Sequence, residues 1–266
     1  MLAIALDKVL EDLVDISRKA GNEILDVYKD SFEITLKEDL SPLTDADKRS
    51  NEVIISKLKS IYPGIPILSE EEKEVQFSAR KSWEMFWLID PLDGTKEFVK
   101  RNGEFTVNIA LIKNQLPIAG VVYAPTKNIF WYGAENIGSY KLEEGSKAKR
   151  IEVNQSTDSP VKVVTSRSHP SAKLESYLKR FSEYEIVHMG SSLKICLVAD
   201  GTAHVYPRLG PTMEWDSGAG HAVLKFAGGE LLDTETSVEL KYNKEILRNP
   251  DFICFTPKIR EICEIL

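Results

Sequence analysis

The segment from Trp87 to Thr95, with the sequence WLIDPLDGT, limits the fold of this chain more than any other stretch. It opens with apolar, strand-forming residues, and we expect the strand to stop at Asp90 because Pro91 cannot donate to a sheet ladder. Gly94 permits close approach of the backbone to a ligand, and Thr95 can cap the helix predicted to follow. The segment therefore predicts a strand that ends in carboxylates and a turn of backbone donors.

Asp90 and Asp93 give this turn two interpretations. Two carboxylates at a strand end can hold divalent cations, while backbone N–H groups at the start of a helix face an anion. A strand, an aspartate-rich turn and a helix cap would produce the same residues without any ligand. The choice between these interpretations depends on the acids elsewhere in the chain.

Acidic residues recur at other predicted strand ends and helix starts. Asp47 lies at one helix start, Glu70 follows a predicted strand within a run of glutamates, and Asp216 precedes another predicted helix. Each of them alone could be a helix cap or part of a solvated surface. Because open α/β sheets collect strand ends and helix starts along one edge, we expect these acids to converge on hard cations.

The pattern of predicted elements gives an α/β fold with two lobes that meet near residue 155. Residues 1–155 are predicted to form an α+β lobe, in which two amphipathic helices precede a hairpin-rich sheet. Residues 156–266 alternate strand and helix and are predicted to form an α/β lobe. The last predicted helix follows Trp215-Asp216 and ends at Gly228.

Net charge and cysteine spacing exclude several kinds of protein. The formal net charge of -7 argues against a nucleic-acid scaffold, although bound cations could still attract an anionic small substrate. Cys196, Cys254 and Cys263 form no CxxC motif, so we expect buried thiols in a reducing compartment. We find no integral membrane segment and no signal peptide, which predicts a cytoplasmic protein. Peripheral association with the cytoplasmic face of the inner membrane stays open.

No side chain stands in a recognisable nucleophile motif. The chain lacks a GxSxG elbow, a Walker A loop and a GxGxxG turn, and its four histidines lack the spacing of zinc ligands. A covalent mechanism of the triad type is therefore not predicted.

Three motifs together resemble the lithium-sensitive, magnesium-dependent phosphatase superfamily that includes the inositol monophosphatases. They are Leu68-Ser-Glu-Glu71, Asp90-Pro-Leu-Asp-Gly-Thr95 and Trp215-Asp216, in that order along the chain. The resemblance begins at the segment 41–47 and continues beyond Trp215. It implies the layered αβαβα sandwich of the inositol monophosphatase and fructose-1,6-bisphosphatase type.

Longer segments are similar to one branch of this superfamily, the CysQ-type 3′(2′),5′-bisphosphate nucleotidases. Inositol monophosphatases usually carry an amide where this chain has Glu97, and this difference also favours the nucleotidase branch. The segments similar to the branch are residues 93–98 (DGTKEF), 101–110 (RNGEFTVNIA), 122–125 (VYAP), 166–169 (SRSH), 190–194 (GSSLK) and 206–208 (YPR).

The resemblance implies a dispersed site with two or three Mg²⁺ ions. Glu70, Asp90 and the backbone carbonyl of Leu92 would hold one ion. Asp93 and Asp216 would hold a second, which Asp90 would share. The ions would activate a water for in-line attack on phosphorus, without a phosphoenzyme.

The resemblance also implies residues for catalysis and substrate binding. Asp47 would hydrogen-bond the hydroxyl of Thr95, which would orient and help to deprotonate the attacking water, and Glu70 would complete the catalytic set. The N–H groups of Gly94 and Thr95 would bind phosphate oxygens. The cation ligands would also contact the substrate. The contacts to the nucleotide part would come from His169, Ser191, Lys194 and Arg208.

The implied substrate is a small phosphorylated nucleotide, 3′-phosphoadenosine 5′-phosphate (PAP), which would be hydrolysed to AMP and phosphate. This reaction would remove a by-product of sulfate activation. Two alternatives stay open: a phosphatase of the same fold that acts on inositol monophosphate or fructose 1,6-bisphosphate, and a non-catalytic sensor of nucleotide or phosphate. The oligomeric state and the preference between PAP and its sulfated form also stay open.

Overall fold

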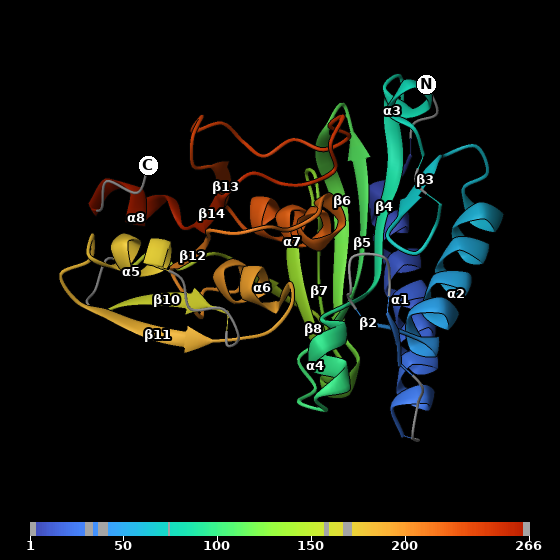
Figure 1. Ribbon diagram of the computed structural model, residues 1–266, viewed down its shortest axis with the longest axis horizontal. Coiled ribbons are helices and arrows are strands. Elements are labelled where there is room, and N and C mark those ends of the chain that lie inside the picture. The colour runs from blue at the N-terminus through green and yellow to red at the C-terminus, as the bar shows by residue number, and fades with distance from the viewer. Residues whose placement is uncertain are drawn as a thin grey trace.

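The chain forms an α/β fold in which helices and sheets alternate in layers. The computed structural model describes residues 4–29, 34–36, 42–73, 75–156, 160–166 and 172–262. The layers follow the order α/β/α/β/α (Figure 1), so the sandwich implied by the resemblance is confirmed.

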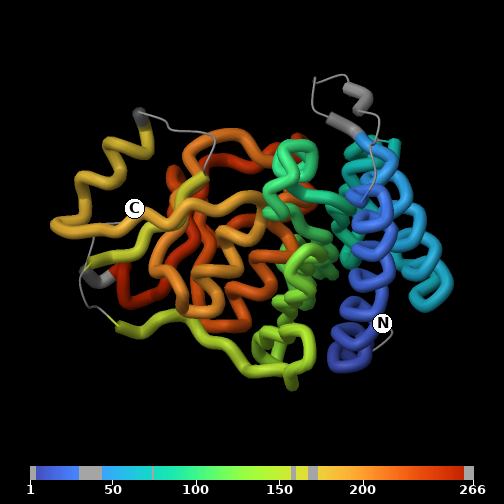
Figure 2. Tube along the Cα trace, turned by 90° about the horizontal axis from the view of Figure 1, so that it is seen from below, coloured from blue at the N-terminus to red at the C-terminus, as the bar shows by residue number. Residues whose placement is uncertain are grey.

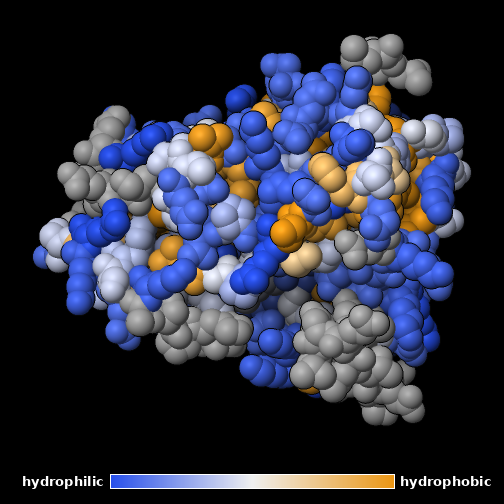
Figure 3. Space-filling view, turned by 45° about the horizontal axis from the view of Figure 1, so that its top comes forward, coloured by the Kyte–Doolittle hydropathy of each residue, from blue (hydrophilic) through white to orange (hydrophobic). Residues whose placement is uncertain are grey.

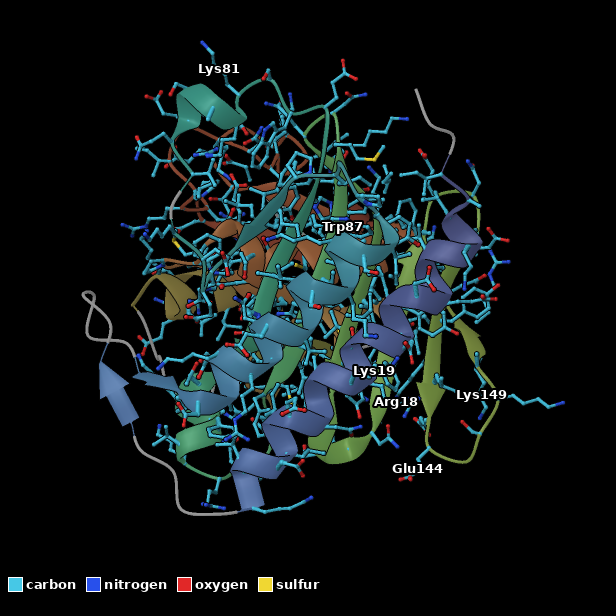
Figure 4. All side chains as sticks on the ribbon, turned by 90° about the vertical axis from the view of Figure 1, so that its right-hand side faces the viewer. Arg18, Lys19, Lys81, Trp87, Glu144 and Lys149 are labelled. Carbon is cyan, nitrogen blue, oxygen red and sulfur yellow. The ribbon has the colours of Figure 1, made fainter. Side chains whose placement is uncertain are left out.

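The larger sheet is covered on its outer face by α1 (Leu6–Lys29) and α2 (Asp45–Ile61), which lie side by side at one end of the molecule (Figure 2). Both helices run across the strands, and Trp87 lies near the C-terminal end of α2, where its ring packs on Tyr62 (Figure 4). The seven strands, in spatial order, are β3 (Ile67–Ser69), β4 (Met85–Asp93), β5 (Thr106–Lys113), β6 (Leu116–Ala124), β7 (Ile129–Ala134), β8 (Gly138–Glu143) and β9 (Lys149–Ile151). Only β3 and β4 pair in parallel within this sheet.

The smaller sheet lies beyond a middle layer made of α6 (Leu193–Ala199) and α7 (Glu214–Phe226). Its five strands, in spatial order, are β11 (Tyr184–His188), β10 (Val161–Thr165), β12 (Val205–Arg208), β14 (Phe252–Phe255) and β13 (Glu230–Asp233). The outer layer on this side is formed by α5 (Ala172–Leu178) and α8 (Pro257–Ile262). The remaining elements are β1 (Ile34–Leu36), β2 (Pro42–Thr44), α3 (Phe77–Arg80), α4 (Thr95–Val99) and a single 3₁₀ turn, η1 (Pro125–Lys127).

Alternation of side chains along the strands builds the cores between the layers. On β4, Trp87 and Ile89 face the core shared with α1 and α2, whereas Leu88 belongs to the core shared with α7. On β10, Val163 faces α5 and α8 while Val164 faces the middle layer. Successive strand residues point to opposite faces, so each apolar run buries both faces of its sheet.

Helix α7 lies close to the large sheet because small residues face each other across the contact. A Cβ added to Gly120 of β6 would stand 2.9 Å from the carbonyl oxygen of Ala219 and 2.9 Å from the Cβ of Ala222. A Cβ added to Gly218 would stand 2.8 Å from a methyl carbon of Leu88. The position of α7, and of the residues at its first turn, therefore depends on the absence of these side chains.

The structure corrects two predictions about the opening segment. β4 does not stop at Asp90 but continues through Pro91 to Asp93, and its pairing with β5 shifts register between Asp90 and Asp93. Such a bulge accommodates a proline that has no N–H for the ladder. Gly94, with a φ of 90°, is the N-cap of α4, so Thr95 is its first helical residue rather than its cap.

The structure also corrects the predicted end of the chain. The helix preceded by Trp215-Asp216 in our prediction begins at Glu214 and therefore contains both residues. Beyond Gly228 the chain adds β13, β14 and α8, which the prediction missed. The large sheet ends at Ile151 and the small one begins at Val161, while α7 packs against both; the division into lobes at residue 155 stays a prediction.

The structure bears on the predictions about membrane segments and thiols only through the described residues. Within them, no helix has the length and apolar character needed to cross a bilayer. One face of the molecule is mostly hydrophilic, with apolar residues in small separate areas (Figure 3). Cys196 and Cys254 are buried free thiols, as predicted, and Cys263 lies outside the described residues.

Gly120→Ala tests the close packing of α7 on β6. We expect the free energy of unfolding to fall by about 1–3 kcal/mol, because the added methyl group overlaps backbone atoms that cannot move independently. Thermal melts measure the effect against Gly210→Ala, where an added Cβ meets nothing within 4 Å. Equal melting temperatures for the two variants would contradict the packing described here.

Candidate active site

A cavity of about 730 Å³ lies where the end of β4 faces β12 and the first turn of α7. Its walls include the predicted cation ligands at one side and the strand end of β12 at the other. The acidic residues and the β4 turn residues that line it are Glu70, Asp90, Leu92, Asp93, Gly94, Thr95, Glu97 and Asp216. The structure thus brings together residues from segments that are far apart in the sequence.

Glu70, Asp90 and Asp216 form a compact acidic cluster. Each offers one carboxylate oxygen, and these oxygens all lie within 4.8 Å of one another. Glu70 follows β3, Asp90 lies on β4 and Asp216 lies in the first turn of α7, so three separate elements supply the cluster. Oxygen ligands at this spacing suit a hard divalent cation, whose charge would offset their mutual repulsion.

Backbone N–H groups orient three of the carboxylates in the cavity. Oδ1 of Asp90 accepts the N–H of Leu92 at 3.1 Å, and Oδ2 of Asp216 accepts the N–H of Met213 at 2.9 Å. Oδ2 of Asp93 accepts the N–H of Ser192, which lies directly before α6. Each carboxylate is therefore fixed through one oxygen by its own turn or by a neighbouring segment.

Burial and mutual repulsion raise the pKa values of two of the cavity acids, Asp93 and Asp216. Loss of solvation raises the pKa of Asp216 to about 8, and the nearby charges of Asp93 and Glu70 act in the same direction. Loss of solvation also raises the pKa of Asp93 to about 6, although the ammonium of Lys194 opposes the change. Burial lowers the pKa of Lys194 to about 8. Asp216 therefore holds a proton at neutral pH unless a cation takes the place of that proton, whereas Asp93 is mostly ionised there.

Asp47 and Thr95 also meet in this structure, although Asp47 lies on α2. Oδ2 of Asp47 accepts the backbone N–H of Thr44 at 2.8 Å and its hydroxyl at 2.7 Å, which closes the capping box of α2. Oδ1 accepts the hydroxyl of Thr95 at 3.3 Å, and the carbonyl of Leu92 lies at the same distance from that hydroxyl. The capping acid of α2 is thereby linked to the β4 turn.

The predicted nucleotide contacts surround a smaller adjoining cavity of about 170 Å³. Ser191, Lys194 and Arg208 line it together with Asp93 and Asp216. Nη2 of Arg208 donates to the carbonyl of Pro211 at 2.6 Å. The remaining predicted contact, His169, lies outside the described residues.

Two residues near the site were not predicted from the sequence. Oε2 of Glu104 accepts the N–H of Gly190 at 2.8 Å and so holds the turn that carries Ser191. Arg248 lines the larger cavity as an exposed cation. Neither lies at a predicted strand end or helix start beside another acid, and no local pattern marks them.

Comparison with known proteins agrees with this geometry. The model of the inositol monophosphatase family matches residues 5–261. The 3′(2′),5′-bisphosphate nucleotidase CysQ of Salmonella typhimurium is 44% identical over 246 residues, which cover 92% of this chain and 98% of that protein. CysQ of Escherichia coli K12 is 45% identical over 247 residues, with the same coverage of 92% and 98%.

Solved structures lead to the same family. CysQ from Bacteroides thetaiotaomicron, described as a bacterial member of the inositol monophosphatase family, superposes with a TM-score of 0.83 at 40% identity. That match covers 94% of this chain and 97% of the other. SuhB from Bartonella henselae shares the fold, with a TM-score of 0.80 at 23% identity over 96% of each chain. This chain belongs to the inositol monophosphatase family.

Proposed function

We propose that this chain is a Mg²⁺-dependent 3′(2′),5′-bisphosphate nucleotidase that hydrolyses the 3′-phosphate of PAP to AMP and phosphate. The observation that carries the proposal is the 44% and 45% identity to nucleotidases over 98% of their length. The acidic cluster supports it independently, because three converging carboxylates are the ligand type that Mg²⁺ prefers. Removal of PAP formed during sulfate activation would be the biological role.

These residues are proposed to hold two or three Mg²⁺ ions, and the converging carboxylates support the proposal. Glu70, Asp90 and the carbonyl of Leu92 would hold one ion, and Asp90, Asp93 and Asp216 a second. Bound Mg²⁺ would lower the pKa of a water and stabilise charge on the phosphate oxygens. The raised pKa values of Asp93 and Asp216 fit this role, because a cation in the cavity would stabilise the ionised form of both carboxylates.

Thr95 and Asp47 are proposed to position the attacking water. The Thr95 hydroxyl donates to Asp47, which leaves the hydroxyl oxygen able to accept a proton from a water in the cavity. Asp47 is only 1% exposed and is held by Thr44, so its oxygen is fixed before substrate arrives. The N–H groups of Gly94 and Thr95 would bind oxygens of the phosphate that is removed.

Cationic side chains on the opposite wall are proposed to bind the nucleotide part of the substrate. Lys194 and Arg208 line the adjoining cavity beside Ser191, and their charges suit the phosphate that is not cleaved. His169 would complete this set. A substrate with two phosphates fits a cavity that has acids with cations at one side and basic side chains at the other.

A substrate panel tests the proposed specificity. With Mg²⁺ present, we expect kcat/KM for PAP to exceed that for inositol monophosphate and for fructose 1,6-bisphosphate by more than about tenfold, or about 1.4 kcal/mol. Phosphate release measures all substrates in one assay. A tenfold preference for either sugar phosphate would assign the chain to the alternative phosphatase activity, and no hydrolysis at all would favour a sensor.

Asp93→Asn tests the proposed second cation site. We expect turnover to fall about a hundredfold or more, because the amide is a weaker cation ligand than the carboxylate. The amide oxygen can still accept the N–H of Ser192, so circular dichroism should show a folded protein. Asp251→Asn, which removes a carboxylate paired with Lys173 outside the cavity, is the matched control and should keep full activity. Full activity in Asp93→Asn would contradict the ligand assignment.

The raised pKa values predict how pH changes the stabilisation by Mg²⁺. Between about pH 4 and pH 8 these two acids bind more protons in the folded, cation-free protein than in the unfolded chain, so their contribution to stability falls as pH rises through this window. Mg²⁺ should therefore raise the melting temperature more at pH 8.5 than at pH 6.0, where protons compete with it. Asp216→Asn should reduce this difference. A larger effect of Mg²⁺ at pH 6.0 would refute the explanation.

A further inference from the structure

Residues 243–249, which we name the clasp, form hydrogen bonds to segments next to two of the cavity acids. The clasp belongs to the loop between β13 and β14, which extends from the small sheet toward the large one (Figure 1). One of its contacts is Arg80, on α3, which follows Glu70 along the chain. The other is Glu214, which lies just before Asp216.

Arg80 binds the clasp through a fully buried guanidinium. Its exposed fraction is 0%, and its Nη1 donates to Oδ1 of Asn243 at 2.9 Å and to the carbonyl of Lys244 at 2.6 Å. Its Nη2 donates to the carbonyl of Glu245 at 2.9 Å, and its Nε donates to the carbonyl of Val75 at 3.1 Å. One side chain thus ties the clasp to the loop that follows Glu70.

Glu214 binds the same residues from the opposite side. Its exposed fraction is 0%, and its carboxylate accepts the N–H of Asn243 at 2.6 Å and the N–H of Lys244 at 2.9 Å. The ammonium of Lys244 lies 2.7 Å from Oε1 of Glu214. The backbone N–H of Glu214 donates to the carbonyl of Leu247 at 2.8 Å. The first turn of α7 is therefore held by its backbone and by a buried charge.

The clasp also reaches the residue that orients Asp216. Nδ2 of Asn249 donates to the carbonyl of Met213 at 2.7 Å, and the N–H of Met213 donates to Oδ2 of Asp216 at 2.9 Å. Movement of the clasp would therefore move Met213 and change the direction of the Asp216 carboxylate. Glu70 and Asp216 belong to separate segments of the chain, and the clasp connects these segments.

We propose that the clasp sets the position of Asp216 relative to Glu70, and that Arg80 and Lys244 are positioning residues for the cation site. This inference rests on the proposed Mg²⁺-dependent function. Lys244 acts through Glu214 and the first turn of α7, and Arg80 acts through the clasp that holds this turn. We therefore expect these two residues to raise the cation affinity of the site, in addition to any general contribution to folding stability.

Lys244→Met separates positioning from simple electrostatics, because the two explanations predict opposite changes in cation affinity. Removal of a positive charge near several carboxylates would strengthen their attraction for a cation. Release of Glu214 and of the α7 turn would instead weaken cation binding, because the ligands would no longer be held at the spacing the ion requires. We expect weaker binding, by about tenfold.

The experiment measures Mn²⁺ affinity of the full-length, substrate-free protein by electron paramagnetic resonance. Lys225→Met is the matched control. Lys225 lies in the last turn of α7, and its ammonium is 2.6 Å from a carboxylate oxygen of Glu239. The exposed fraction of its side chain is 31%, against 29% for Lys244. The control should bind Mn²⁺ as the wild type does, and melting temperatures would show that both variants are folded. Arg80→Lys, which keeps the charge but loses the branched donor group, should also weaken binding.

The outcomes distinguish this inference from the proposed function. If the Lys244→Met variant binds Mn²⁺ as tightly as the Lys225→Met variant, or more tightly, the positioning role is overturned and the proposed function stays intact. A wild-type protein that binds no Mn²⁺ would overturn the proposed function and this inference together. Weaker binding in both Lys244→Met and Arg80→Lys, with the control unchanged, is the result we expect.

Discussion

The hydrogen bond from a backbone N–H to one carboxylate oxygen is the interaction on which this site depends. Asp90, Asp93 and Asp216 would repel one another in a partly dry cavity, and burial already raises the pKa of the last two. Each is held in place by an N–H, from Leu92, Ser192 and Met213 respectively. Such bonds fix direction without adding charge, and those to Asp90 and Asp216 help to hold these two carboxylates close to each other and to Glu70.

The layered fold supplies these donors from different parts of the chain. The bulge at the end of β4 provides the Leu92 N–H, the turn before α6 provides that of Ser192, and the residue before α7 provides that of Met213. Their relative positions depend on how closely α7 lies on the large sheet, which Gly120 permits. The cavity is therefore a consequence of packing between layers, since no single motif contains all of it.

Much of the site could be predicted from the sequence because its acids lie at strand ends and helix starts. The pattern of apolar residues predicted a hairpin-rich sheet followed by alternating strands and helices, and the convergence of Glu70, Asp90 and Asp216 was expected at the edge of an open sheet. The continuation of β4 through Pro91 could not be predicted, because the bulge exists only in pairing with β5. The Arg80–Asn243 contact spans 163 residues and has no local signal. The roles of the individual site residues remain proposals.

The central claim is that carboxylates from separate layers together bind a divalent cation. The most direct measurement is an anomalous difference map from crystals of the protein grown with Mn²⁺. The account predicts a strong peak that contacts oxygens of Glu70 and Asp90, and density that also contacts Asp216. Mn²⁺ bound elsewhere, with none at these carboxylates, would contradict it.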